Sequence, residues 1–332
     1  MRVLYIYRHP DMGFSIGKVF RPIEEEMKKY AEVDSVYLPC PNYKPLSLWQ
    51  NIKAARQTVR KKHYDIVHIT GTEHYLLPFL RKENTVVTVH DLGFFTNTGG
   101  LTIRSVWKYF AFIKTLRYAK CCTFISDKSH KEALRYVSLK DGQHVTVVNP
   151  IGDDFQYVPK EINTDYPRIL HMGTKPNKNL DNTILALKGM PCHLRIIGDV
   201  STSQKAHMGI YGIEYSSAKD ISDDQVVMEY ADADIINFPS FYEGFGMPII
   251  EGQKVGRPVL TSEIAPMNDI AGGAAVLVNP ADYKSIRNGY RTILANPDKY
   301  VKEGLKNVKR FSIGKIAKEY LEIYKRVLNG SK

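Results

Sequence analysis

The chain has 332 residues, 43% of them hydrophobic and 24% charged, which is the composition of a globular protein with room for two ordinary domains. No apolar run approaches the length of a membrane span, and the first residues lack the long apolar region of a secretory signal. The net charge of +11 is concentrated in the first half, where segments 44–62 and 92–126 carry basic residues and no acidic ones. Such a basic surface attracts the phosphate groups of nucleic acids or of anionic membranes.

The cysteines give no sign of an oxidising compartment. They show neither the C-x-x-C pattern nor the spacing of a zinc site, so we predict free, buried thiols. The four positions are Cys40, Cys121, Cys122 and Cys192. We therefore expect a cytoplasmic protein, and peripheral contact with the inner face of the membrane stays open.

Apolar, strand-like runs alternate with helical segments along the whole chain, which predicts an α/β fold with parallel sheets. In the first half we predict strands at 2–7, 33–38, 65–69, 85–90, 121–126 and 144–148, and helices at 17–30, 47–62, 102–118 and 127–137. After a polar, proline-bracketed linker at 156–167, we predict strands at 168–173, 193–197, 213–216, 233–237, 258–261 and 275–278. Helices at 283–295, 297–309 and 313–328 end the chain.

This series predicts two doubly wound, Rossmann-like domains, 1–160 and 161–312, followed by a terminal helical segment, 313–332. The last helix has one apolar face at helical spacing. Its members are Ile316, Tyr320, Ile323, Tyr324 and Val327. Because ligands of open α/β sheets bind beyond the carboxyl ends of the strands, we expect functional residues just after strands, around a cleft between the two domains.

The most informative segment is 238–251, where a predicted strand leads through a glycine turn into a helix. Glu243 and Glu251 flank the turn, and Pro248 suits a first helical position. Free amides at a helix N-terminus bind phosphate, and carboxylates bind sugar hydroxyls, so the segment fits a phosphorylated sugar ligand. Alternatively, Glu251 is only a first-turn glutamate favoured by the helix dipole.

The pattern Glu-Gly-Phe-Gly-x-Pro-x-x-Glu resembles the Glu-x7-Glu signature of retaining glycosyltransferase family 4, within the group 1 glycosyltransferases, and segment 256–261 is also similar to that family. The resemblance implies the GT-B fold, with the terminal helix crossing back to the N-terminal domain. It implies a retaining, metal-independent hexosyltransferase that needs no cofactor. Its donor diphosphate would contact the Gly244, Phe245 and Gly246 turn. Glu251 would bind the ribose, and Glu243 would face the donor sugar.

A second loop, 173–180, follows the first strand of the second domain and resembles the phosphate loop of the family. It begins at Gly173, and Lys178 matches the lysine of the family. Many members have an arginine just before this lysine, where this chain has Asn177, so Lys175 is the expected second cation. Gly198, after the next strand, is expected at the nucleotide base. A plain βα turn with solvated lysines is the alternative reading of this loop.

The first domain offers weaker matches. Gly13 and Gly17 resemble the glycine-rich loop of the family, or they are simple turn residues. His90 matches a residue near the transferred sugar, with a buried structural histidine as the alternative. Glu243, Lys178 and His90 would then carry the chemistry. Acceptor-side residues are also expected beyond these strands. They are Asp91, Glu73 and His74.

Two other features favour structural interpretations. Asp232-Ala-Asp234 has the D-x-D pattern of metal sites in another glycosyltransferase fold, but it runs directly into a strand, so we expect no metal there. Segment 102–118 mixes aromatic and basic residues without a single basic face, which favours ordinary packing over a membrane helix.

The sequence therefore predicts transfer of a sugar from a UDP- or GDP-sugar to a glycan or lipid-linked glycan in surface polysaccharide synthesis. Contact with an anionic membrane is an option, and no nucleic-acid partner is expected. Three alternatives stay open: a sugar-nucleotide epimerase of the same fold, a non-catalytic sugar-nucleotide binder and a nucleic-acid-binding protein.

Overall fold

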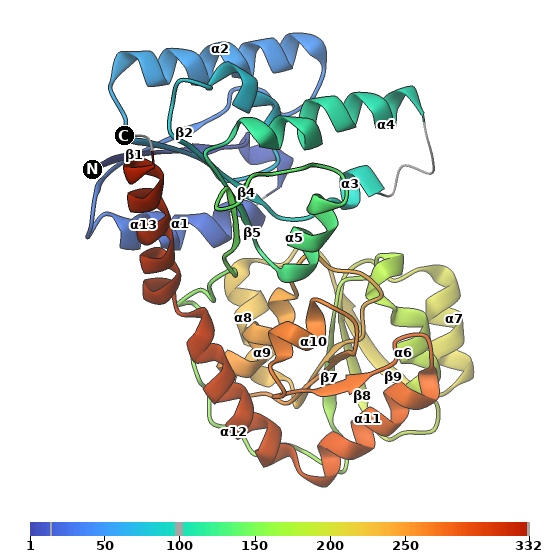
Figure 1. Cartoon of the computed structure of the whole chain (residues 1–332). Helices are drawn as coiled ribbons and strands as arrows, with labels where there is room; N and C mark the ends of the chain where they lie inside the picture. Colours follow the sequence, from blue (N-terminus) through green and yellow to red (C-terminus); the bar gives the residue numbers. More distant parts are fainter. Residues whose placement is uncertain (14, 97–101, 331–332) are drawn as a thin grey trace. The chain divides into compact units, whose positions relative to one another are not determined.

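The computed structural model describes residues 1–13, 15–96 and 102–330, and these fall into two compact units (Figure 1). Unit 1 comprises residues 1–152 together with the terminal segment from Ser312, and unit 2 comprises Asp153–Phe311. The chain thus leaves unit 1, builds unit 2 and returns. Within the described ranges, no helix has both the length and the apolar character that crossing a membrane requires.

In the described part of unit 1, six strands form one parallel sheet in the order β2-β1-β3-β4-β5-β6. The strands are β1 Arg2–Tyr7, β2 Glu32–Tyr37, β3 Ile66–Ile69, β4 Thr85–Val89, β5 Cys121–Phe124 and β6 His144–Thr146. The helices are α1 Ser15–Met27, α2 Pro45–Lys61, α3 Gly93–Thr96, α4 Ile103–Lys108, α5 Asp127–Leu134 and α13 Ile313–Asn329. Shorter turns are η1 Pro10–Met12, η2 His74–Phe79, η3 Tyr109–Ile113 and η4 Lys114–Tyr118.

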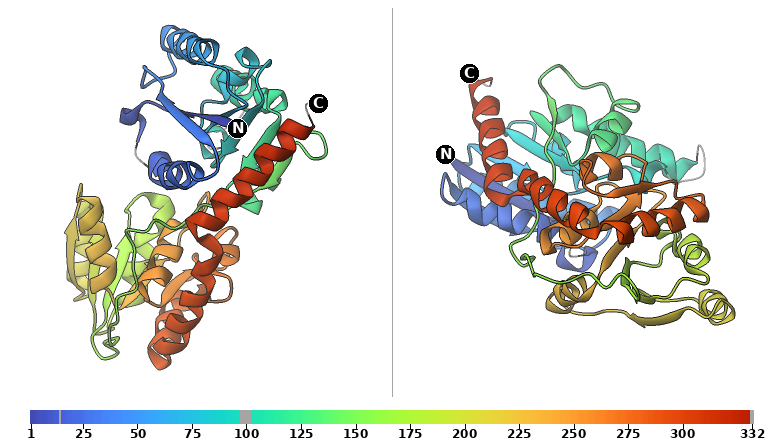
Figure 2. Two further views of the ribbon diagram at one scale, coloured as in Figure 1. Left: turned by 90° about the vertical axis from the view of Figure 1, so that its left-hand side faces the viewer. Right: turned by 90° about the horizontal axis from the view of Figure 1, so that it is seen from below.

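The terminal helix α13 belongs to the core of unit 1, which confirms that it packs back on the N-terminal domain. It lies beside α1 and covers one face of the sheet (Figure 2). Its Tyr324 hydroxyl lies 3.0 Å from the Tyr5 hydroxyl and 2.7 Å from Nδ1 of His68 on β3. Burial lowers the pKa of His68 to about 3, so this imidazole stays neutral. The apolar face predicted for this helix is buried.

Unit 2, all of whose residues are described, repeats the pattern with the strand order β12-β11-β10-β7-β8-β9. Its strands are β7 Arg168–Met172, β8 His193–Ile197, β9 Glu214–Ala218, β10 Ile235–Phe238, β11 Val259–Ser262 and β12 Val276–Val278. Its helices are α6 Leu180–Leu187, α7 Thr202–Ile210, α8 Asp223–Asp232, α9 Met247–Val255, α10 Met267–Ala271, α11 Tyr283–Ala295 and α12 Pro297–Asn307. The turns η5 Pro176–Lys178 and η6 Val308–Phe311 complete the unit. Every pair of adjacent strands is parallel, as predicted.

Buried polar residues hold the segments of unit 2 together. Asp234 is 3% exposed, and its carboxylate accepts hydrogen bonds from the amides of Asn163 and Arg168 and pairs with Lys160. The predicted structural reading of the Asp-Ala-Asp sequence is therefore confirmed. The buried guanidinium of Arg257 donates to four backbone carbonyls, including those of residues 231 and 255 at the ends of α8 and α9. A cation at a helix C-terminus is favoured by the helix dipole.

Segment 102–118 differs from the predicted single helix. α4 ends at Lys108, a π-helical turn follows at η3, and a 3-10 turn follows at η4. Phe112, Ile113 and Leu116 are buried, as ordinary packing requires, but Trp107 and Phe110 are 40% and 53% exposed. The packing interpretation therefore holds for the buried residues of this segment and does not account for its exposed aromatic side chains.

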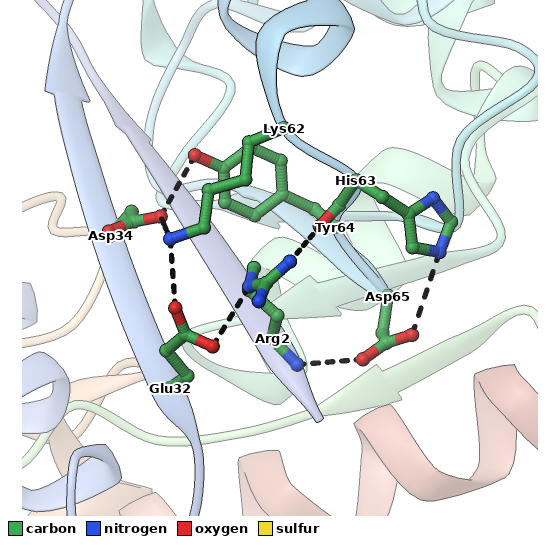
Figure 3. Close-up of polar contacts among 7 residues, drawn as sticks. All are labelled: Arg2, Glu32, Asp34, Lys62, His63, Tyr64 and Asp65. Atoms are coloured by element: carbon green, nitrogen blue, oxygen red, sulfur yellow. Dashed lines mark hydrogen bonds and ion pairs between the residues drawn. The ribbon is translucent and has the colours of Figure 1, made fainter.

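A network of charged groups joins the amino ends of β1, β2 and β3 in unit 1 (Figure 3). Lys62 donates to Glu32 at 2.9 Å and to Asp34 at 2.6 Å, while the side chain of Arg2 donates to Glu32 at 2.9 Å. The backbone amide of Arg2 donates to Asp65 at 2.7 Å. At this side of the sheet the cations are thus matched by carboxylates.

Candidate functional site

In each unit the strand order reverses beside the first strand, which places two loops next to each other at the carboxyl edge of the sheet. In unit 2 the reversal lies between β7 and β10, which pair in parallel. Ligands of open α/β sheets bind at such a reversal. The loops that follow these two strands are 173–179 and 239–246, the same two loops that the sequence motifs predicted.

An ion pair joins these two loops. Lys178 Nζ donates to Glu243 Oε1 at 2.7 Å, and both side chains are mostly buried, with 22% and 15% of their surface exposed. The ammonium also lies 4.7 Å from the centre of the Phe238 ring, within the range of a cation–π contact. The two residues predicted to act on the donor are therefore in direct contact, although 65 residues separate them.

Two asparagines hold the loops in register. Asn177 donates through its side chain to the carbonyl of residue 242 at 3.0 Å, and its own carbonyl accepts from the amide of residue 241. Asn179, which is 4% exposed, donates to the carbonyls of Pro239 and Pro280 at 2.9 and 2.7 Å. Its φ of +64° is left-handed, a conformation that asparagine tolerates better than most residues. Asn177 therefore positions Glu243 and does not replace the second cation.

The glycines of these loops sit where a side chain would not fit. Gly173 has φ +86°, and a Cβ there would lie 3.1 Å from Lys178 Cγ. Gly198 follows β8 with φ +150°, and its Cβ would lie 2.8 Å from the side chain of Thr174. Gly246, with φ +120°, is the N-cap of α9, which has no side-chain cap. The amides of this helix terminus are thus served by no capping side chain, and the helix dipole favours an anion there.

The remaining residues that the sequence predicts at the donor lie in the same unit. Phe245 is buried with its ring edge-on to Phe311, so it anchors the turn between Gly244 and Gly246. Glu251 lies in α9, and its Oε2 accepts a 2.6 Å hydrogen bond from the Tyr230 hydroxyl. Burial, and then the charge of Glu251, raises the pKa of Tyr230, so the phenol remains a donor. Sequence reasoning missed Tyr230 because it lies on α8, outside any motif.

Lys175 is exposed at the start of η5, and among the described residues it makes no hydrogen bond or ion pair through its side chain. Behind the loop, Nδ1 of His171 on β7 accepts from Asn237 at 2.8 Å. Burial, and then the charge of Lys178, lowers the pKa of His171 to about 3, so this histidine is neutral beneath the ion pair.

In unit 1 the strand order reverses between β1 and β3, and a buried polar cluster lies at their carboxyl ends. Arg8 follows β1 and donates to the carbonyl of Gly13 at 3.0 Å. Glu73 and His74 follow β3 and are each 1% exposed. Among the residues that the structure describes, one atom of each of these side chains is buried and finds no hydrogen-bond partner. The three atoms are Arg8 Nε, Glu73 Oε2 and His74 Nε2.

Burial raises the pKa of Glu73 to about 7, against a smaller lowering by Arg8, and lowers the pKa of His74 to about 4. A buried carboxyl and a neutral imidazole with unused polar atoms are suited to bind hydroxyl groups, because buried polar groups are normally satisfied. Sequence reasoning included Glu73 and His74 but missed Arg8, which no motif marked.

The other predicted residues of unit 1 are placed as follows. His90, after β4, lies 2.8 Å through Nε2 from the carbonyl of Thr70, and burial lowers its pKa. Asp91 accepts from the amide of Gly93 at 2.8 Å, which turns the chain into α3. Gly17 lies inside α1 and not in the loop before it. Among the described residues, no group of three or more acidic, histidine or cysteine side chains could hold a metal ion.

We predict that Asn179 is the residue that fixes the Lys178 loop. Asn179→Ala would place a residue that tolerates φ +64° less well than asparagine and would remove both hydrogen bonds, so it should lower the free energy of unfolding by about 2–4 kcal/mol. Asn179→Gly keeps the backbone conformation and should cost roughly 1–3 kcal/mol. Urea unfolding followed by circular dichroism measures both. Asn182→Ala, which removes one bond to Pro280, is the control, and an equal loss in all three variants would contradict the prediction.

We also predict a pH effect from Glu73. Its folded pKa of about 7 exceeds the ordinary value of 4.5, so between these values folding retains a proton that the unfolded chain releases. The contribution of Glu73 to stability therefore falls from pH 4.5 to 7 and levels off above. As the pH rises from 4.5 to 7, the free energy of unfolding of Glu73→Gln should therefore increase by roughly 3 kcal/mol relative to that of the wild type.

The fluorescence of Trp49 and Trp107, the two tryptophans of the chain, follows the unfolding of unit 1. Glu25→Gln, which changes an exposed carboxylate, is the control and should show no such trend. A Glu73→Gln variant whose stability difference stays constant with pH would exclude a neutral carboxyl at this position.

Residues 154–310 match the model of the family described as glycosyl transferases group 1. Curated relatives include an O-antigen chain mannosyltransferase of Salmonella typhimurium, 25% identical over 68% of this chain, and an O-antigen chain mannosyltransferase of Escherichia coli, 26% identical over 64%. The matches span 65% and 61% of the lengths of these two relatives, which is less than two thirds of either protein.

Solved structures resemble the fold of the whole chain. A sucrose-phosphate synthase from Thermosynechococcus elongatus aligns with a TM-score of 0.81 at 18% identity, covering 99% of this chain and all of that one. Anabaena HepE in complex with UDP and glucose aligns with a TM-score of 0.74 at 14% identity, covering 98% and 100%.

The parallel sheets, the returning helix and these neighbours confirm the predicted GT-B fold. The family match lies in the unit that holds the Lys178–Glu243 pair, and it confirms the resemblance to the group 1 glycosyltransferases. Unit 2 of this chain is thus similar in sequence to the group 1 glycosyltransferase family.

Proposed function

We propose that the chain is a retaining, metal-independent glycosyltransferase that moves a hexose from a UDP- or GDP-sugar to a hydroxyl of a glycan or lipid-linked glycan. The observation that carries the proposal is the ion pair between Lys178 and Glu243 at the strand-order reversal of the unit that matches the group 1 family. A sugar-nucleotide diphosphate carries two kinds of group, phosphate and hydroxyl, and the paired loops offer a cation, helix amides and carboxylates for them.

The donor would exchange partners with the ion pair. Lys178 and Glu243 neutralise each other at 2.7 Å, and an arriving diphosphate competes for the ammonium. Glu243 is then released to accept hydrogen bonds from the donor sugar. Glu251, held by Tyr230, binds the ribose hydroxyls, while the amides near Gly246 receive the phosphate. Binding therefore gives the Lys178 ammonium a new anionic partner, while the Glu243 carboxylate exchanges its cation for hydrogen bonds from sugar hydroxyls.

In the transfer step, the bond between the anomeric carbon and the diphosphate oxygen breaks, and a bond to the acceptor oxygen forms on the same face. The acceptor proton passes to the departing phosphate, so no separate protein base is required. Negative charge grows on the diphosphate as it leaves. Lys178 and the α9 amides stabilise it in place of a divalent ion, and such preorganised groups are usually the largest catalytic contribution.

The acceptor would bind in unit 1, where Arg8, Glu73 and His74 leave buried polar atoms unsatisfied beside His90. Mannose is our first candidate for the transferred sugar, because the two curated relatives are O-antigen chain mannosyltransferases. The same relatives favour a role in surface polysaccharide synthesis.

Removal of the cation tests the proposal. Lys178→Ala should lower kcat by about 10²–10³, the usual effect of deleting one charge-stabilising donor. Glu243→Gln should keep or increase nucleotide diphosphate affinity while sugar transfer falls, since Lys178 loses its competing partner. Lys205→Ala removes an exposed lysine of α7 and is the control.

The assay follows nucleotide release and product formation with a panel of UDP- and GDP-sugars and acceptors. Full sugar transfer by Lys178→Ala would refute the assigned roles. Conversion of the donor sugar without any acceptor would instead identify an epimerase, and the absence of nucleotide-sugar binding would exclude both enzymes.

We further propose that unit 1 attaches peripherally to an anionic membrane on the cytoplasmic side. α2 and the α4–η3 segment pack on the same hydrophobic cluster and expose apolar side chains outward. Trp49 and Phe110 are 57% and 53% exposed, and each has a lysine ammonium over its ring, from Lys53 and Lys114. Aromatic side chains beside lysines are typical of surfaces that lie in a lipid interface.

Flotation with vesicles tests this attachment. The Trp49→Ala, Trp107→Ala double variant should bind vesicles containing phosphatidylglycerol several-fold less than the wild type, because it loses the largest apolar contacts. The Ile210→Ala, Met228→Ala variant removes two exposed apolar residues of unit 2 and should bind normally. Two results would argue against this surface. One is equal flotation of the wild type with neutral and anionic vesicles, and the other is equal flotation of the wild type and the Trp49→Ala, Trp107→Ala variant.

A further inference from the structure

Unit 1 contains a basic cavity of about 620 Å³ at the end of its sheet opposite the polar cluster of Arg8, Glu73 and His74. Three segments that lead into β4, β5 and β6 line it, together with the end of α13. Its charged lining consists of five basic residues and one acidic residue. They are Arg81, Arg117, Lys120, Lys140, Arg326 and Asp141.

The cations of this cavity lack the carboxylate partners that neutralise Arg2 and Lys62 of the same unit, among the residues that the structure describes. At the amino ends of β1 to β3, Arg2 and Lys62 are each matched by carboxylates (Figure 3). In the part of the chain that the structure describes, none of the five cavity cations makes an ion pair with a carboxylate. Five like charges around one hollow repel one another, so the folded state bears a cost that an anion would relieve.

Several contacts hold the lining in place before any ligand arrives. The Arg81 guanidinium lies 4.1 Å from the centre of the Tyr118 ring, and Arg326 Nη2 lies 3.5 Å from Cys121 Sγ. Gln143 connects the segments, since its side-chain nitrogen Nε2 donates to the backbone carbonyls of residues 117 and 119 at 3.1 and 2.6 Å. Its side-chain oxygen accepts from the amide of Lys140 at 2.9 Å. A preformed lining lowers the ordering cost of binding.

The chemistry of the lining selects phosphate. Arginine presents a planar fork of donors that matches phosphate oxygens, and lysine adds point charge. The volume lies within the range of small-molecule sites. β4 has five residues, so about 16 Å of strand separates this end from the carboxyl edge where His90 lies. A small ligand in this cavity would therefore not occupy the acceptor region of unit 1.

We propose that this cavity is a second anion site, which binds a phosphate-bearing ligand, either a soluble phosphate ester or the headgroup of an anionic lipid. This site is independent of the diphosphate site proposed in unit 2, because it uses none of the residues of that unit. A lipid headgroup bound here would hold unit 1 at a phosphate-rich surface. A soluble phosphate ester would instead make the protein responsive to phosphorylated metabolites.

The test compares two double variants of the full chain that lose the same charge. R117Q/K140Q removes two exposed cavity cations, and K299Q/K302Q removes two exposed lysines of α12 in unit 2. Binding of inorganic pyrophosphate is measured by calorimetry at low ionic strength in a Lys178→Ala background, so that the diphosphate site proposed in unit 2 is not titrated. The first variant should bind about tenfold more weakly than its parent, and the second within about twofold.

Vesicles with and without phosphatidylglycerol distinguish the source of the phosphate. Loss of pyrophosphate binding in R117Q/K140Q alone supports a soluble ligand, and loss of vesicle binding alone supports a lipid headgroup. Equal binding by all proteins in both assays, or equal weakening in the two double variants, would overturn the proposal. With Lys178 present, sugar transfer by R117Q/K140Q should stay within about twofold of the wild type. Failure of the anion-site proposal would therefore not imply failure of the proposed enzyme activity.

Discussion

The contact between Lys178 and Glu243 depends on a constraint of the sheet rather than on the two residues themselves. Strands β7 and β10 are far apart in the chain, yet they pair in parallel because the strand order reverses between them. Their loops therefore leave the sheet side by side at the same edge. Asn179 then joins the loops through two carbonyls, and Gly173, with φ +86°, brings the backbone close to the Lys178 side chain.

Buried polar groups in this protein fall into two kinds. Asp234 and His68 have both polar side-chain atoms occupied by backbone or side-chain partners, and they hold strands and segments together. Glu73 and His74 are as deeply buried but each leaves an atom unsatisfied at the carboxyl edge of unit 1. Because an unsatisfied buried polar group costs free energy, the second kind is the better indicator of a binding site.

The net charge of the chain also hides an uneven arrangement of charged groups in unit 1. At one half of the amino edge of unit 1, carboxylates neutralise Arg2 and Lys62, and at the other half five cations surround a cavity with a single acidic residue. Both halves contribute to the same positive total. The contrast between them separates cations that stabilise the fold from cations that are free to bind an anion.

The sequence by itself determined the type and order of the elements, because hydrophobic periodicity is a local property of neighbouring residues. It also located the two glycine loops of unit 2 that meet at the strand-order reversal, since glycines at positive φ and a helix start leave local patterns around Gly173 and Gly246. The return of α13 to unit 1 came from family resemblance, since periodicity shows that a helix has a buried face and not what covers it.

Only the tertiary structure decided which distant side chains meet. Tyr230 orients Glu251 from another helix, Arg8 joins the cluster around Glu73, and the cavity cations come from four separate segments. The break of segment 102–118 into α, π and 3-10 turns was equally invisible, because it follows from how Phe112 and Leu116 fit the core. Such contacts depend on packing between elements, and no pattern of adjacent residues encodes them.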